Sequence, residues 1–367
     1  MHIRRLRGFV AVTFATVLAL SACATENDNG TSSTEQPSTS TPSSASPTGE
    51  LLPAAEGTTT YPYVISTQWG ETTLEERPER IAVLGFSSNS DVLQALDVIP
   101  VYAMTEDGDF EWKSQEWLDA VEFTDTATRR DPINFEGVAG TNPDLIVIHN
   151  WLGDQADYDR LATIAPVLDH AVSDRDALDW RADQRLIGEA LDLSAAAEKV
   201  IADADARVAE IAAAHPEFEG KTVTIATEYD AGLSYYTFPG GPAEAALLDL
   251  GFVPNPLAQE LEEQPGYVEN NRSVSEENFQ KLDADYLIVL FDGEANKADI
   301  ENSALFQAIP AVADGRYLGM NADVWDEERT ETGMNATWVY RRGASALSVP
   351  WAAEVLADKW LTGITES

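Results

Sequence analysis

The sequence is poor in cysteine, histidine and basic side chains. Its 367 residues include one cysteine, four histidines and 23 lysines or arginines, against 63 aspartates or glutamates. A single cysteine excludes an internal disulfide. The formal net charge of −40 argues against nucleic acid or an anionic membrane surface as a partner of the folded chain. This acidity is typical of a strongly hydrated surface.

The chain also lacks the short motifs of several enzyme classes. It has no G-x-S-x-G nucleophile elbow, H-E-x-x-H, C-x-x-C or P-loop. His149, His170 and His215 are too scattered in sequence to suggest a metal triad, so a structural role is expected for each. We therefore expect no resident metal or cofactor and no enzymatic activity. A hydrolase that uses paired carboxylates is kept as an alternative.

The first 23 residues carry a targeting pattern. Three arginines form a basic head, an apolar run that is short for a membrane span follows, and Leu-Ser-Ala-Cys ends at Cys23. The pattern resembles the lipobox of bacterial lipoproteins, which implies cleavage before Cys23 and lipid attachment to it. We expect a signal peptide at residues 1–22 and a protein anchored on the extracytoplasmic face of the cell membrane. Export by the general or the twin-arginine route stays open.

Composition divides the rest of the chain. Residues 23–58 are rich in Ser, Thr and Pro and offer little to bury, so they are expected to form a disordered tether. We expect an N-terminal α/β lobe at 59–193, an interlobe helix at 194–214 and a C-terminal α/β lobe at 215–367.

The interlobe helix is the longest element that the pattern predicts. Residues 194–214 contain no Gly or Pro, and Ser194 is a suitable N-cap. Apolar residues recur at helical spacing on one face. At about 1.5 Å per residue such a helix is roughly 30 Å long, about the width of a small domain. We therefore expect it to act as a strut between the lobes.

Short apolar runs that alternate with helical segments predict a mostly parallel sheet in each lobe. The expected strands are Ile81–Gly85, Val98–Met104, Asp144–His149, Lys221–Thr227 and the run after Asp285, with a β-hairpin over residues 61–76. One spacing occurs in both lobes. Glu136 precedes Asp144 by eight residues, and Glu277 precedes Asp285 by eight. In each copy a helix beginning near the Glu should lead into a buried strand.

Several stretches, in this order, resemble the substrate-binding lipoproteins of iron-siderophore, haem and cobalamin ABC importers. The matching stretches are Pro78–Ile81, Asn142–Ile146, Ile164–Val167, Leu282–Tyr286 and Phe306–Tyr317. The resemblance covers Tyr61 to Leu361 and implies two α/β lobes joined by one long helix. It also implies that Glu136 and Glu277 dock the lobes on an ABC transporter permease.

The resemblance implies a ligand site between the lobes. Arg129, with Arg130 beside it, matches the Arg that reaches metal-bound oxygens in ferric-hydroxamate binders, and its planar fork of donors suits paired oxygens. Trp338 matches an aromatic residue that lines the ligand site. The remaining candidates, from loops after strands or beside Trp338, are Trp151, Trp325, Phe86 and Arg341.

The sequence therefore predicts a monomeric, membrane-tethered receptor for a ferric siderophore. A hydroxamate is favoured, and the iron is expected to be held by the siderophore. Two departures from the family pattern leave the ligand open: the expected loop Tyr near Gly153 is absent, and Arg341-Arg342 are inserted beside Trp338. Catecholates, mixed chelates, haem and cobalamin stay as alternatives.

Overall fold

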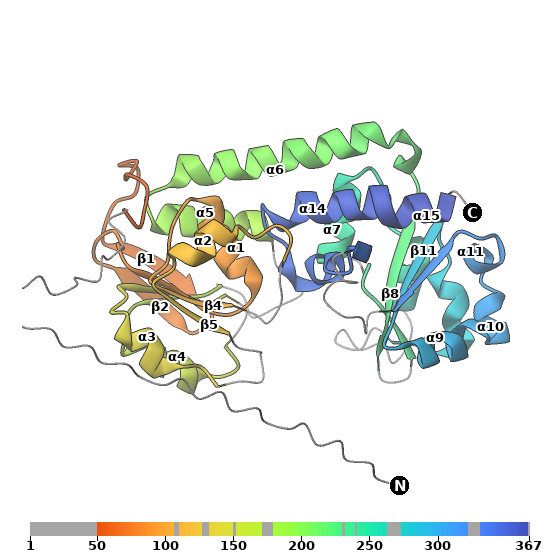
Figure 1. Cartoon of the computed structure of the whole chain (residues 1–367), viewed down its shortest axis with the longest axis horizontal. Helices are drawn as coiled ribbons and strands as arrows, with labels where there is room; N and C mark the ends of the chain where they lie inside the picture. The colour runs from red at the N-terminus through yellow and green to blue at the C-terminus, as the bar shows by residue number, and fades with distance from the viewer. Residues whose placement is uncertain are drawn as a thin grey trace, which may run out of the picture. The chain divides into compact units, whose positions relative to one another are not determined.

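A computed structural model describes residues 50–105, 110–126, 132–149, 152–170, 179–229, 232–238, 241–262, 273–321 and 331–365. Residues 47–367 form one compact unit. This unit holds two five-stranded sheets and a two-stranded hairpin (Figure 1). Within the described ranges, no helix has the length and hydropathy that crossing a membrane requires.

The N-terminal lobe is built on a fully parallel sheet of order β5-β4-β3-β6-β7. Its strands are β3 (Ile81–Val83), β4 (Tyr102–Thr105), β5 (Phe123–Thr126), β6 (Leu145–Val147) and β7 (Val167–Leu168). Its helices are α1 (Ser87–Ala95), α2 (Gln115–Ala120), α3 (Phe135–Gly140), α4 (Gln155–Ala162) and α5 (Trp180–Ala190). The central strands β3 and β6 are apolar and buried at every position, as expected for strands covered on both faces.

The predicted hairpin is present as β1 (Tyr63–Thr67) and β2 (Gly70–Leu74). Gly70 follows the two-residue loop with φ of +135°, a value that residues with a Cβ rarely adopt. The hydroxyl of Thr72 donates to the carbonyl of Val167 at 2.6 Å. The hairpin therefore packs beside β7 at the edge of the sheet.

The C-terminal lobe contains a mixed sheet of order β10-β9-β8-β11-β12. Its strands are β8 (Val223–Tyr229), β9 (Gly232–Tyr235), β10 (Ser273–Val274), β11 (Tyr286–Phe291) and β12 (Tyr317–Asn321). Strands β8, β11 and β12 are parallel, whereas β9 runs antiparallel to β8 and to β10. The helical segments are η1 (Pro216–Phe218), α7 (Pro242–Asp249), α8 (Pro256–Glu262), η2 (Glu276–Leu282), α9 (Glu294–Glu301), α10 (Ala304–Gln307) and α11 (Pro310–Ala313).

The interlobe helix α6 (Ser194–Ala214) has the predicted bounds. Ala197, near its start, packs with α5 in the N-terminal core. Ile201, Val208 and Ile211 belong instead to the core of the C-terminal lobe, where α6 lies beside α14 (Ser348–Glu354) (Figure 1). One helix therefore takes part in both cores, which confirms the predicted two-lobe α/β architecture.

The predicted cap of α6 is wrong. Ser194 is the first residue of the helix, and its backbone neighbours Ala195 and Ala196 donate to the carboxylate of Glu56 at 2.7 and 2.9 Å. A carboxylate at a helix N-terminus satisfies free N–H groups and interacts favourably with the helix dipole. The cap comes from a residue that is distant in sequence, so no local pattern indicates it.

Residues 50–59, here called the N-terminal strap, lie against the N-terminal lobe. The carboxylate of Asp192 accepts backbone hydrogen bonds from Gly57, Thr58 and Thr59 at 2.7 to 2.9 Å. Leu52 packs on the N-terminal core. The expectation of a disordered tether through residue 58 is thus corrected for residues 50–58, because an apolar residue and a buried acceptor fix them.

The last part of the chain returns to the junction of the lobes. Its helical segments are α13 (Ala336–Trp338), the π-helical η3 (Val339–Gly343), α14, the π-helical η4 (Val355–Leu361) and α15 (Thr362–Thr365). They pack into the C-terminal core, and η3 also approaches α1 of the N-terminal lobe. The two lobes are therefore joined by contacts of this segment as well as by α6.

Candidate functional site

Five of the predicted site residues fall within the described part of the chain: Phe86, Trp338, Arg341, Glu136 and Glu277. Arg129, Arg130, Trp151, Trp325 and Cys23 lie outside the described residues, so their predicted roles stay predictions.

Phe86 and Trp338 meet at the junction of the lobes. Phe86 follows β3 and is the N-cap residue of α1, while Trp338 ends α13. Their ring centroids are 5.1 Å apart with the planes inclined at 58°. Phe86 is buried and Trp338 is half-buried, so part of the Trp338 side chain is accessible to solvent. The carboxyl ends of parallel strands, where Phe86 lies, are where α/β sheets bind ligands.

The backbone around Trp338 fits the indole closely. A Cβ at Gly343 would lie 2.4 Å from Cδ1 and Nε1 of Trp338, closer than real Cβ contacts. The turn between them is π-helical, the form that a helix takes when it holds an extra residue. Arg341 in this turn is exposed, with its guanidinium carbon 6.0 Å from the ring centroid of Tyr236. Arg341 and Trp338 thus lie on the same short segment.

A buried polar cluster ties the lobes together close to α1. The carboxylate of Asp91 is fully buried and accepts from the Lys113 ammonium at 2.5 Å and from the Trp112 indole at 2.8 Å. It also accepts from the hydroxyl of Ser345 at 2.8 Å, which comes from the other lobe. We call these four residues the Asp91 cluster. The ion pair of Asp91 with Lys113 lies within the N-terminal lobe, and the hydroxyl of Ser345 adds the contact from the other lobe.

Glu136 and Glu277 occupy matching positions in the two lobes. Each is exposed and lies in the first turn of its helical segment, α3 or η2. The expected helix in the C-terminal copy is a 3₁₀-helix. Each segment leads into a buried strand, β6 or β11, as the repeated spacing predicts. The sequence pattern thus gave the correct position for both acids, while their docking role stays a prediction.

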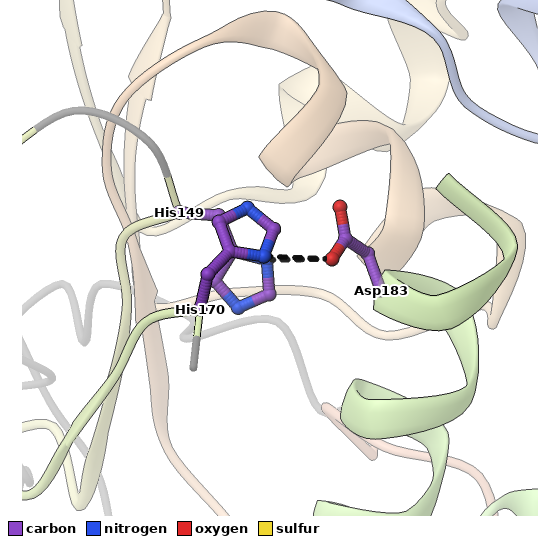
Figure 2. Close-up of side chains that lie close together, drawn as sticks. All are labelled: His149, His170 and Asp183. Carbon is purple, nitrogen blue, oxygen red and sulfur yellow. Dashed lines mark ion pairs between the residues drawn. The ribbon is translucent and has the colours of Figure 1, made fainter. Parts of the chain in front are cut away.

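The structure also places three side chains together that sequence reasoning kept apart: His149, His170 and Asp183. One ligand atom from each lies within 4.8 Å of the others (Figure 2). His149 follows β6 by two residues, and His170 follows β7 by two. Because β6 and β7 are adjacent and parallel, their carboxyl ends bring the histidines side by side. The sequence could have placed the two histidines together only if residues 167 and 168 had been identified as a strand.

The histidines of this cluster differ electrostatically. Burial, helped by the adjacent His170, lowers the pKa of His149 to about 3, so its ring is neutral at neutral pH. Burial alone would lower the pKa of His170, but the hydrogen bond and charge of Asp183 raise it. Among the described residues this is the one group of His, Cys, Asp or Glu that could hold a metal ion.

Comparison with known proteins gives a consistent result. Residues 81–324 match the family model described as periplasmic binding protein. The chain is 27% identical over 326 residues to the probable siderophore-binding lipoprotein YfiY of Bacillus subtilis, covering 84% of this chain and 88% of that protein.

Solved structures share the fold. The iron-uptake protein PiaA of Streptococcus pneumoniae in complex with ferrichrome has a TM-score of 0.65 and 23% identity, covering 83% of this chain and 99% of that one. Staphylococcus aureus SirA complexed with staphyloferrin B has a TM-score of 0.61 and 20% identity, covering 81% and 98%. The resemblance predicted from the sequence is confirmed: with two sheets, one shared helix and a family match over most of its length, the chain belongs to the periplasmic binding protein family.

Proposed function

We propose that this protein is an extracytoplasmic receptor that captures a ferric siderophore, with hydroxamate types favoured, and delivers it to an ABC importer. The observation that carries the proposal is the aromatic pair Phe86–Trp338, which both lobes supply at the carboxyl end of β3. Relatives that carry siderophore names support the ligand class. Binding, rather than catalysis, is the role that we assign.

In this proposal the siderophore holds the iron and the protein holds the siderophore. The exposed side of Trp338 would contact the apolar periphery of the chelate. Arg129, Arg130 or Arg341 would contact its metal-bound oxygens, which stay negative while coordinated to Fe(III). Trp151 and Trp325 would complete the aromatic lining. Because the lobes share α6 and the Asp91 cluster, capture should need only a small closure.

The ligand is tested by titrating the purified chain and following tryptophan fluorescence. The probes are ferrichrome, a ferric tris-catecholate, ferric staphyloferrin B, haem and cobalamin. We expect sub-micromolar quenching by ferrichrome. Tighter binding of a catecholate, haem or cobalamin would replace the hydroxamate assignment, and no binding by any probe would overturn the receptor role.

The residues are tested by Trp338→Ala and Arg129→Ala, measured with the probe that binds. Each should raise Kd by about tenfold or more, because an anchoring aromatic or a charged hydrogen bond contributes roughly 1.5–3 kcal/mol. Arg185→Ala is the control, since Arg185 is exposed and pairs with Glu198 on α6. Unchanged affinity in either test variant would remove that residue from the site.

The membrane anchor belongs to the same proposal. Acylation of Cys23 would hold the receptor at the extracytoplasmic face, with residues 24–49 as the tether. Intact-mass measurement of protein extracted from cells should show a diacylglycerol adduct that Cys23→Ser abolishes. A mature chain of unmodified mass would contradict the anchor and leave the ligand assignment untouched.

A further inference from the structure

The cluster of two buried histidines, His149 and His170, and the half-buried Asp183 lies in the N-terminal lobe and has no part in the receptor function proposed above. His149 and His170 are 1% and 7% exposed. Their ring centroids are 4.3 Å apart, and the carboxylate of Asp183 lies beside both rings (Figure 2). The residues come from the end of β6, the end of β7 and the first turn of α5.

The cluster leaves polar atoms without partners. Three ring nitrogens have no hydrogen-bond partner among the described residues: Nδ1 and Nε2 of His149, and Nε2 of His170. A buried polar atom left unsatisfied costs about 1–3 kcal/mol, and buried polar atoms in native proteins are nearly always paired. His149, with both ring nitrogens unsatisfied beside His170 and the carboxylate of Asp183, thus indicates a group that binds to them.

We propose that His149, His170 and Asp183 bind a divalent transition-metal ion, with Zn²⁺ as the best fit. Two imidazoles and one carboxylate are common zinc ligands, and three protein ligands leave one position for water. Ligands held about 2.0–2.1 Å from a tetrahedral ion lie roughly 3.4 Å from each other. The Nδ1 atoms of His170 and His149 lie 3.0 and 3.7 Å from Oδ1 of Asp183, on either side of that value.

The surroundings match the charge of such an ion. Asp169, the residue before His170, is fully buried and adds a second carboxylate close to the cluster. It accepts hydrogen bonds from the His170 amide and, at 2.6 Å, from the indole of Trp69. Asp183 and Asp169 together would balance a divalent cation, so the buried site would carry no net charge.

The expected role of the ion is structural. It would connect two adjacent strand ends to α5, which packs against the interlobe helix α6. Binding to the folded state alone stabilises that state by mass action. Bound metal should therefore raise the midpoint temperature of unfolding, independently of any siderophore.

The test is a Zn²⁺ titration of the untagged chain after removal of bound metal, with excess Mg²⁺ present to occupy surface carboxylates. We expect one Zn²⁺ per chain, a raised midpoint of unfolding, and visible absorption bands of tetrahedral Co²⁺ when cobalt replaces zinc. The cobalt spectrum is recorded on the wild-type chain, so this test does not depend on the folding of a variant. Absence of stoichiometric Zn²⁺ uptake, or a cobalt spectrum of octahedral type, would overturn the proposal.

Variants locate the ion. His149→Gln and Asp183→Asn should each weaken Zn²⁺ binding more than the loss of an outer-shell partner would. Loss of such a partner costs about 10–100-fold in affinity, so a larger loss indicates a direct ligand. The matched control is His215→Gln, because His215 is also an imidazole beside carboxylates but lies outside the cluster. It directly follows α6 and is 3.0 and 3.2 Å from the carboxylates of Glu217 and Asp358. Loss of binding in the control, with binding kept in the cluster variants, would place the ion on the surface instead.

Discussion

The two lobes repeat one contact, in which an aspartate carboxylate accepts hydrogen bonds from the segment just before a central strand. In the N-terminal lobe, Asp144 precedes β6 and accepts from the amides of Glu79 and Arg80, just before β3, at 2.9 and 2.8 Å. In the C-terminal lobe, Asp285 precedes β11 and accepts from the amide and hydroxyl of Thr222, just before β8, at 2.9 and 3.1 Å. In both lobes a carboxylate therefore aligns the starts of two central parallel strands.

The opposite ends of the same strands differ. The N-terminal lobe carries His149 and His170 after β6 and β7, whereas β11 and β12 of the other lobe end in Phe291 and Asn321. The N-terminal sheet is fully parallel, and the C-terminal sheet is mixed. The lobes thus share the contacts that build a sheet and differ in the side chains that could carry chemistry.

The largest expected effect comes from breaking the buried Asp91 cluster, which includes one contact between the lobes. Asp91→Asn removes the carboxylate that pairs with the Lys113 ammonium, whose side chain is 7% exposed. We expect a loss of about 3–5 kcal/mol in the free energy of unfolding, measured by urea titration. The exposed pair of Lys199 and Asp203 supplies the control, and Asp203→Asn should cost no more than about 0.5 kcal/mol. Equal losses in both variants would show that the buried pair contributes no more to stability than the exposed one.

The repeated carboxylates allow a direct comparison of the lobes. Asp144→Ala removes two hydrogen bonds to an exposed carboxylate, and Asp285→Ala removes two from Thr222 and a longer one from the Lys221 ammonium at 3.4 Å. We expect each to lower the free energy of unfolding by about 1–2 kcal/mol. Values that differ by more than about 1 kcal/mol would mean that the two connections are not equivalent.

The strap gives the N-terminal lobe a pH dependence of its own. Backbone hydrogen bonds, with that of Thr59 the largest contribution, lower the pKa of Asp192 from 3.8 to about 2. This stabilisation is fully present above pH 3.8 and is lost as the pH falls toward 2. In this range the Asp192 carboxylate of the unfolded chain takes up a proton more readily than that of the folded chain, so acid favours unfolding. The stability difference between the wild type and Asp192→Asn should therefore shrink across this range. A difference that stays constant with pH would contradict the assignment.

Glu136 and Glu277 should have the smallest effect on stability. Each is exposed in a first helical turn, so replacement by Gln should cost about 0.3–1 kcal/mol through the helix dipole. If both dock on a permease, each variant should reduce siderophore-dependent iron uptake by cells while ligand affinity stays unchanged. Wild-type uptake in both variants would remove the docking role.

The sequence was sufficient for elements with strong local signals. Helix α6 has its predicted bounds because no Gly or Pro interrupts it and its apolar residues recur at helical spacing. Strands β3, β6 and β11 were found because they are continuous apolar runs. Their order and the repeated Glu–Asp spacing were then enough for the fold class.

Elements that depend on distant partners were missed. Glu56 caps α6 from about 140 positions away in sequence, so Ser194 was the better local candidate. Strand β7 has two residues and β5 is mostly exposed, so neither has a period to detect. Without β7 the sequence could not place His170 beside His149. Of the ligand-site candidates, Phe86 was chosen because it follows a strand and Trp338 through the family resemblance. The structure brings the two rings together, and their ligand role stays a prediction.

The attachment of the strap has a mechanical consequence. Glu56 binds the first turn of α6, and the neighbouring residues bind Asp192 just before that helix. A pull on the chain upstream of residue 50 would first load the hydrogen bonds that Ile99 and Arg77 donate to the carbonyls of Leu51 and Pro53, and then these bonds at the start of the rod that both lobes share. Tension applied at residue 50 would therefore be shared between the N-terminal lobe and the interlobe helix before it reached the first strand.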